Sequence, residues 1–201
     1  MMRETLDAGL PMLGLDLPED VRQTLCDFGA AVIKQNEVMN LTAITQPDQV
    51  AKLHLLDSLT VLTAADLRGK QIIDVGCGAG FPGVPLAIAC PEAQITLLDS
   101  LGKRVDFLRE TADAMGLRRV RCVHARAEEF ARKHREQFDI ATSRAVAQLN
   151  VLCELTLPLV KVGGVFLAMK SVESDPELQE ARSAIAQLGG AVEDVTDYTI
   201  P

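Results

Sequence analysis

Hydrophobic residues follow two different spacings along the chain, and the change between them falls near residue 69. Before that point they recur every three or four positions, as on the buried side of an amphipathic helix. One such stripe consists of Val21, Leu25, Phe28 and Val32. Pro18, just before it, is typical of the first turn of a helix. The pattern therefore predicts that residues 1–68 form a helical extension packed on the domain that follows.

A second helix is predicted between about Pro47 and Ala64. Its broad apolar face is expected to consist of Val50, Leu53, Leu56 and Leu59. His54 and Asp57 are three positions apart, so they are neighbours on the surface of this helix. They either form part of a substrate-binding wall or make an ordinary hydrogen-bonded or packing pair, and the spacing alone leaves both interpretations open.

After Gly69, short apolar runs alternate with stretches of helical spacing. The predicted strands are residues 72–75, 95–98, 120–124, 138–142, 165–169 and 192–198. The predicted helices are residues 84–89, 101–115, 149–160 and 176–188. Gly163-Gly164 are expected to turn the chain into the fifth strand. Such alternation is typical of an α/β domain with a mainly parallel, Rossmann-like sheet, here over residues 69–201.

Candidate chemistry is concentrated between Gln71 and Ser100. The predicted order is strand, glycine-rich turn, helix, strand and then Asp99, which is the order of a nucleotide-binding βαβ unit. Glycine permits positive φ and a close approach of the backbone to a ligand. The Asp99 carboxylate, at the end of the second strand, can accept two hydrogen bonds from ribose hydroxyls.

Two motifs overlap in this turn. Gly78, Gly80 and Gly83 satisfy G-x-G-x-x-G, the pattern of dinucleotide-binding proteins. Residues 74–80 satisfy D-x-G-x-G-x-G, the pattern of S-adenosylmethionine (SAM) methyltransferases. A carboxylate at Asp74 would repel a pyrophosphate and attract the ammonium group of SAM. The pattern therefore favours SAM, while a dinucleotide or a turn without a ligand remain alternatives.

The net charge of −8 is unevenly distributed. Residues 103–135 contain ten Lys and Arg against five Asp and Glu, so the rest of the chain is strongly acidic. Such a basic region either contacts a phosphate backbone or is simply a solvated helix face and loop. The composition is poor in aromatic residues, with no Trp and one Tyr, which argues against a wide base-stacking platform.

Other features narrow the class of protein. The five cysteines are far apart and form no C-x-x-C pair, so we expect reduced thiols and neither a metal site nor a disulfide framework. No apolar run reaches the roughly 18–20 residues needed to span a bilayer. The N-terminus has no signal-peptide pattern. These observations predict a cytoplasmic protein that does not enter a membrane.

Several longer blocks resemble the bacterial small-subunit rRNA guanine-N7 methyltransferases, once called glucose-inhibited division protein B. The blocks are N-L-T at 40–42, H-L-L-D-S-L at 54–59, D-V-G-C-G-A-G-F-P-G at 74–83, L-L-D-S-L-G-K-R-V-D-F-L at 97–108, R-A-E-E-F at 126–130 and S-R-A-V-A at 143–147. The glycine block is shared by many methyltransferases, whereas those at 97–108 and 143–147 are more specific. The resemblance covers essentially the whole chain.

The resemblance implies a class I SAM-dependent methyltransferase fold with an N-terminal helical cap. It implies methyl transfer from SAM, which leaves S-adenosylhomocysteine, to N7 of a guanine in 16S rRNA. The partner would be 16S rRNA or the small ribosomal subunit, and we expect a monomer. The implied donor-site residues are Asp74, Gly76, Gly78, Phe81, Asp99, Ala127, Glu128 and Arg144. Candidate substrate contacts are Asn40, His54, Lys103, Arg104 and Lys170.

This chemistry agrees with the residues after the fourth predicted strand. Guanine N7 has a lone pair and no proton to lose, so alignment with the methyl group suffices and no general base is needed. Enzymes that methylate exocyclic amines typically have an Asn/Asp-Pro-Pro-aromatic loop there, but this chain has Thr142-Ser143-Arg144-Ala145. No Pro-Cys of the cytosine-C5 type occurs. Arg144 either grips a phosphate or a guanine edge, or holds the loop through a salt bridge.

Three other functions remain open at this stage. They are a SAM-dependent methyltransferase with another acceptor, a non-catalytic rRNA-binding assembly factor, and an NAD-dependent oxidoreductase. One departure from the family is expected at the end of the chain. The family continues through a final strand where this sequence ends at Thr199-Ile200-Pro201, so we expect an open sheet edge that is prone to aggregation.

Overall fold

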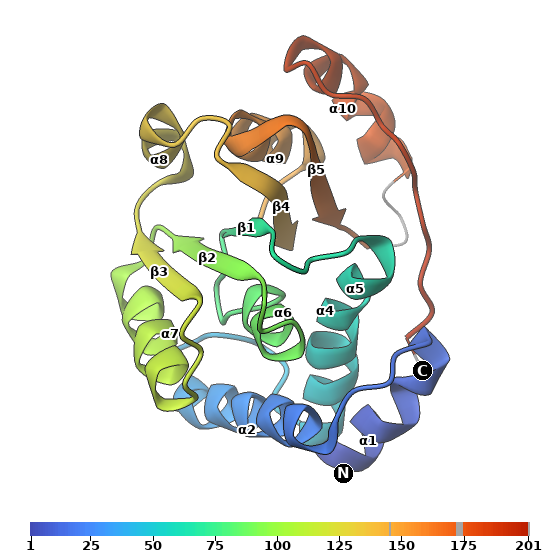
Figure 1. Ribbon diagram of the computed structural model, residues 1–201, viewed down its shortest axis with the longest axis vertical. Coiled ribbons are helices and arrows are strands. Elements are labelled where there is room, and N and C mark those ends of the chain that lie inside the picture. Colours follow the sequence, from blue (N-terminus) through green and yellow to red (C-terminus); the bar gives the residue numbers. More distant parts are fainter. Residues whose placement is uncertain (145, 172–174, 201) are drawn as a thin grey trace.

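The computed structural model describes residues 1–144, 146–171 and 175–200. Its centre is a parallel sheet with strand order β3-β2-β1-β4-β5 (Figure 1). The strands are β1 (Gln71–Val75), β2 (Gln94–Asp99), β3 (Val120–His124), β4 (Phe138–Arg144) and β5 (Val160–Met169). Between and after them lie α6 (Gly83–Ala89), α7 (Gly102–Ala114), α8 (Ala127–Lys133), α9 (Leu149–Thr156), the 3-10 turn η3 (Leu157–Leu159) and α10 (Asp175–Gln187). The prediction of a mainly parallel α/β sheet is therefore confirmed.

The three central strands, β1, β2 and β4, are buried on both faces of the sheet. Successive side chains of a strand point to opposite faces, so Ile72 and Ile73 enter different hydrophobic clusters. The cluster around Ile72 includes the helical extension, whereas the cluster around Ile73 includes Phe130 of α8 and Phe138 of β4. Each fully buried Leu, Ile or Phe side chain contributes about 1.5–3 kcal/mol to stability. Burial on both faces explains why these strands are almost continuously apolar.

The extension consists of several short helical elements and one long helix. They are α1 (Met2–Gly9), the 3-10 turn η1 (Pro11–Leu13), α2 (Glu19–Asn36), α3 (Pro47–Val50), the π-helical segment η2 (Ala51–Leu56), α4 (Asp57–Leu59) and α5 (Val61–Ala64). In α2, Leu25, Phe28 and Val32 are fully buried, and Val21 packs beside them, as predicted. The extension and the sheet share one hydrophobic cluster, so the extension packs directly on the α/β domain.

The second predicted helix exists, but it is not a regular α-helix. Residues 47–64 are helical with a π-helical turn at Ala51–Leu56, where the turn is wider than in an α-helix. The wider turn rotates the following residues about the axis. Leu55 and Leu56 are fully buried, whereas Leu53 is 40% exposed. The prediction that Leu53 lies on the buried face is therefore wrong.

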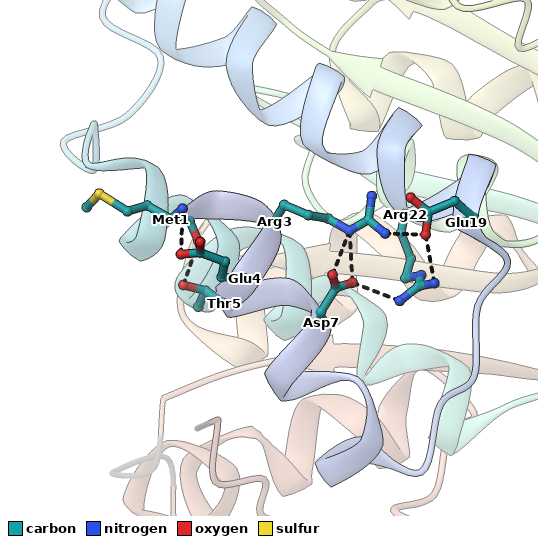
Figure 2. A network of polar contacts seen from close by, with 7 residues as sticks. All are labelled: Met1, Arg3, Glu4, Thr5, Asp7, Glu19 and Arg22. Carbon is teal, nitrogen blue, oxygen red and sulfur yellow. Dashed lines mark hydrogen bonds and ion pairs between the residues drawn. The ribbon is translucent and has the colours of Figure 1, made fainter.

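A network of ion pairs joins α1 to α2 at the start of the chain (Figure 2). Asp7 accepts hydrogen bonds from Arg3 Nε at 2.8 Å and from Arg22 Nη1 at 2.9 Å. Glu19 contacts both arginines, and its distance to Arg22 Nη2 is 2.9 Å. We call these four residues the N-terminal network. It fixes the short α1 against the longer α2.

The chain between α9 and β5 differs from the prediction. Helix α9 ends at Thr156, because Pro158 cannot donate a backbone hydrogen bond and instead lies in the 3-10 turn η3. Strand β5 then begins at Val160, five residues earlier than predicted. Gly163 and Gly164 do not precede the strand but form an irregularity within it, with Gly163 at a φ of 80°. The helix predicted to reach residue 160 is thus too long.

The strand predicted at 192–198 is absent from the described part of the chain. Residues 190–200 have no regular secondary structure and run from α10 back to the N-terminal helices (Figure 1). There, the Tyr198 hydroxyl accepts a hydrogen bond from Thr63 Oγ1 at 2.7 Å, and Ile200 packs on the cluster around Ile72. The segment lies against the extension, away from any strand with which its backbone could pair. Among the described strands, β5 is therefore an edge of the sheet.

Candidate functional site

A pocket of about 460 Å³ opens at the carboxyl ends of β1, β2 and β4. Its lining residues are Leu41, Thr42, His54, Gly76, Cys77, Gly78, Ala79, Phe81, Asp99, Ser100, Leu101, Arg104, Arg144 and Val146. The volume falls in the range of about 300–1,000 Å³ found for small-molecule sites. The strand order reverses between β1 and β4, and ligands of open α/β sheets bind at such a point.

The floor of the pocket is the glycine-rich turn after β1. Gly76 and Gly78 have φ values of 73° and 56°. Residues other than glycine rarely adopt this backbone conformation. The turn is fixed to β2, because the backbone N–H of Gly76 donates to Leu98 O at 2.8 Å. A Cβ atom on Gly76 would lie 2.5 Å from Cγ2 of Val146. Glycine is therefore needed there both for backbone conformation and for space.

Asp99 ends β2 at the side of this turn. Its Oδ2 accepts a hydrogen bond from Gly78 N at 2.9 Å, and its Oδ1 accepts one from Leu101 N at 2.8 Å. Arg104 Nη1 lies 4.0 Å from the same carboxylate. A carboxylate has about four lone-pair positions, so two remain for a ligand in the pocket. The backbone thus fixes Asp99 in an orientation suited to a pair of hydroxyl groups.

Asp74 does not line the pocket, although the sequence suggested that its carboxylate attracts the donor. It is fully buried, and its Oδ2 accepts a hydrogen bond from Gly83 N at 2.9 Å, at the start of α6. Burial raises the pKa of Asp74 to about 7, and the Gly83 hydrogen bond opposes this shift only in part. The expected contact with an ammonium group is therefore not supported. Asp74 instead holds the glycine-rich turn against α6.

Arg144 ends β4 and crosses to the helical extension. Its Nη1 donates to Asp57 Oδ2 at 2.6 Å and to Leu53 O at 3.1 Å. Its Nη2 lies 3.2 Å from His54 Nδ1, and the guanidinium carbon lies 5.3 Å from the centre of the Phe81 ring. We call Arg144, Asp57, His54 and Phe81 the pocket cluster. It joins the sheet, the glycine-rich turn and the extension at one wall.

His54 is a neutral member of this cluster. Burial, and then the charge of Arg144, lower its pKa to about 4. Its ring stacks on Phe81 with a centroid separation of 4.6 Å and an interplanar angle of 26°. His54 Nε2 forms a 2.8 Å hydrogen bond with Thr42 Oγ1. A neutral imidazole fits here because it packs on an aromatic ring beside an arginine.

Comparisons with known proteins agree over most of the chain. Residues 21–200 match the family model described as rRNA small subunit methyltransferase G. The chain belongs to this family. Proteins named ribosomal RNA small subunit methyltransferase G from Alkaliphilus metalliredigens and Staphylococcus carnosus are 45% and 46% identical to it. The first alignment covers 98% of this chain and 83% of the relative, and the second covers 93% and 80%.

Solved structures support the fold of the family member. A SAM-dependent O-methyltransferase from Thermotoga maritima has a TM-score of 0.54 at 21% identity, covering 78% of this chain and 55% of the other. A SAM-dependent methyltransferase from Aquifex aeolicus has a TM-score of 0.53 at 15% identity, covering 80% and 87%. At these identities the likeness establishes the class I methyltransferase fold and nothing further.

The structure brings together about half of the residues singled out from the sequence. Those that line the pocket are Gly76, Gly78, Phe81, Asp99, Arg144, His54 and Arg104. Ala127 and Glu128 start α8 outside the lining, and Glu128 is exposed and pairs with Arg126 at 3.1 Å. Asn40 and Lys103 are also exposed outside it. Lys170 Nζ already contacts Glu177 at 2.7 Å and Ala147 O at 2.9 Å.

Two parts of the wall were missed by sequence reasoning. Leu41 and Thr42 enter the pocket from the loop after α2, which is held by Asn36 Oδ1 through the N–H groups of both residues, at 2.7 and 2.9 Å. An Asn at the end of a helix is a recognised turn signal. The turn at Asn36 could therefore have been predicted from the sequence. Val146 follows β4 and lies over Gly76, and no local pattern marks that contact.

Among the residues that the structure describes, no helix is long and apolar enough to cross a membrane. Nor do these residues contain a group of three or more His, Cys, Asp or Glu side chains arranged to hold a metal ion.

Proposed function

We propose that this family member transfers the methyl group of SAM to N7 of a guanine in 16S rRNA, alone or within the small ribosomal subunit. It would act as a monomer in the cytoplasm, with residues 1–68 as a cap on the SAM-binding domain 69–201. The rRNA substrate is supported by the name of relatives that are 45% and 46% identical over almost the whole chain. The guanine N7 position is supported by the resemblance stated above and by the chemistry of the pocket.

The observation that carries the proposal is the convergence of a glycine-rich turn, Asp99 and Arg144 on one pocket. The residues fit SAM. The turn presents backbone without side chains at Gly76 and Gly78, and Asp99 has unused acceptor positions for ribose hydroxyls. When bound, SAM supplies an electrophilic methyl group, and S-adenosylhomocysteine is the product.

The pocket residues bind and orient rather than exchange protons. Guanine N7 has a free lone pair, so holding it in line with the methyl group supplies the rate advantage. His54, with a pKa of about 4, is a poor base at neutral pH. Burial raises the pKa of the Cys77 thiol well above its usual value, so it is a poor nucleophile. Arg144 can donate to guanine O6 or to a phosphate while N7 stays free.

Contacts with the rRNA backbone would come from the cations around the pocket mouth. Arg104 lines the pocket, and Lys103 is exposed beside it at the start of α7. We expect binding to weaken steeply as salt rises, because each phosphate contact releases counterions. Lys170 contributes less to this surface, since it is already paired with Glu177.

The test is transfer of a labelled methyl group from SAM to small ribosomal subunits from cells that lack this activity, and to stripped 16S rRNA. We expect 7-methylguanosine as the only labelled nucleoside. Binding of S-adenosylhomocysteine is measured on the same protein, with NAD as the control ligand. Donor binding without label in either RNA would contradict the proposal and favour another acceptor or a non-catalytic rRNA-binding role.

A further inference from the structure

Arg144 belongs to the sheet, but the extension holds its guanidinium. The polar atoms around it are Asp57 Oδ2, Leu53 O and His54 Nδ1, and all three come from residues 53–57. These residues span the end of the π-helical segment and the start of α4. The side chain is only 16% exposed as a result. The position of a pocket cation therefore depends on a helical element that lies outside the sheet.

Asp57 supplies the charged acceptor in this arrangement. Its contact with Arg144 Nη1, at 2.6 Å, is the shortest of the three, and charge-assisted hydrogen bonds are the stronger kind. His54 is neutral, so it neither repels Arg144 nor competes with Asp57 for it. Asp57 does not line the pocket. Its direct contact with a pocket-lining side chain is the one with Arg144, so we expect its effect on a ligand to pass mainly through Arg144.

Orientation matters because an arginine side chain has many rotamers. An unanchored guanidinium would lose that freedom each time it met a substrate, which lowers the efficiency of binding and transfer. Here Asp57 and Leu53 O hold one side of the group, and the Phe81 ring lies against it, with the guanidinium carbon 5.3 Å from the ring centre. The group is thereby fixed at the pocket wall before any ligand enters.

We propose that Asp57 is a positioning residue that orients Arg144 for the acceptor nucleotide. Because Asp57 lies in the helical extension and Arg144 lies in β4, the extension must dock on the sheet for this side chain of the pocket to be ordered. The inference rests on the proposed methyl transfer for its functional consequence, but the ion pair itself is testable without any transfer assay.

The experiment compares Asp57→Asn, Asp57→Glu and the wild type in methyl transfer to 16S rRNA or small subunits. Asp57→Asn keeps the shape of the side chain and removes its charge. We expect kcat/KM for the RNA to fall about 10-fold or more. The affinity for S-adenosylhomocysteine should change less than about 3-fold, because the glycine-rich turn and Asp99, which carry the proposed donor contacts, are left in place. Asp57→Glu should recover most of the lost transfer, since it restores the carboxylate.

A matched control is Asp66→Asn. Asp66 lies in the same extension and pairs with Arg68 at 2.8 Å, but both side chains are exposed and neither lines the pocket. Asp66→Asn should leave transfer unchanged. Wild-type transfer by Asp57→Asn would overturn the proposal. The proposal would also be overturned if transfer fell only in proportion to the loss of folded protein. It would be overturned too if Asp57→Glu did not restore transfer.

A double-mutant cycle separates this inference from the proposed function. The melting temperatures of Asp57→Asn, Arg144→Gln and the double variant are measured on the free protein. We expect less than additive effects, because either change alone breaks the same ion pair. Additive effects would overturn the ion pair even if transfer is normal. Absence of transfer by the wild type would instead overturn the proposed function, while the cycle still decides whether Asp57 and Arg144 are coupled.

Discussion

Two arginine–carboxylate clusters involve the helical extension, and they differ in what surrounds them. The N-terminal network links α1 to α2 through Asp7 and Glu19 (Figure 2), and the side chain of Glu19 is 71% exposed to solvent. The pocket cluster links β4 to the extension through Asp57 and Arg144, next to a stacked His and Phe pair. Both contain short hydrogen bonds. Contact distance therefore does not separate the two clusters, whereas burial and the pocket beside the second one make it the candidate for a functional role.

Of the predicted effects, the largest is that of Arg144→Ala in the pocket cluster. We expect methyl transfer to fall by roughly a hundred- to a thousand-fold, or about 2.7–4 kcal/mol, because a fixed charged donor is removed from the pocket. Folding stability should fall by only about 1 kcal/mol, since Asp57 is a third exposed and can be solvated. Transfer kinetics and urea unfolding on the same preparation measure both. Equal losses would mean that Arg144 acts only as a structural salt bridge.

The second prediction uses the low pKa of His54. The folded protein holds this group near 4, whereas the unfolded chain titrates near the usual value of 6.5. The unfolded state therefore binds the proton first. The contribution of His54 to the free energy of unfolding is therefore fully present above pH 6.5. It is lost as the pH drops from 6.5 toward 4, by roughly 3 kcal/mol in total.

Urea unfolding of the wild type and of His54→Gln between pH 7.5 and 4 checks this expectation. The difference between the two proteins isolates His54 from Asp74, whose raised pKa of about 7 acts in the opposite direction. Below pH 6.5 the advantage of the wild type over the variant should shrink. A constant difference across this range would show that His54 is not held neutral by its surroundings.

Asp99→Ala tests the other side of the pocket. Affinity for S-adenosylhomocysteine should weaken by roughly 1–3 kcal/mol, because ribose hydroxyls lose a charged acceptor and the Gly78 N–H loses its partner. Isothermal titration measures the change. Unchanged affinity would remove Asp99 from the donor site and leave the pocket cluster as the main functional feature.

The smallest effect is expected in the N-terminal network. Asp7→Asn removes the carboxylate charge that pairs with both Arg3 and Arg22. The side chains of these two arginines are about a quarter exposed. The melting temperature should fall by at most about 2–4 °C, and the fall should be smaller at high salt. Methyl transfer at 25 °C should be unchanged. A large loss of transfer would show that α1 also acts on the pocket and would remove the contrast between the two clusters.

Local patterns predicted much of the molecule. The alternation of strands and helices, the stripe on α2 and the turn from Asp74 to Gly80 all rest on neighbours in sequence, and the structure confirms them. Predictions failed where a distant contact decided the outcome. Leu53 is exposed within a π-helical segment whose Leu55 and Leu56 pack in the core shared with the sheet, and Tyr198 contacts Thr63, 135 positions earlier, in place of a strand. Neither effect is encoded in a short window of residues.

The sequence by itself determined the family, the parallel α/β fold and the glycine-rich turn with Asp99 at its side. It could do so because spacing, backbone φ and strand ends are local properties. Only the tertiary structure decided which charges meet. Asp57 and Arg144 are 87 residues apart and pair across the pocket wall, while Asp74 turns inward to Gly83. Ion pairing and burial depend on how the extension packs on the sheet, so no motif in the chain specifies them.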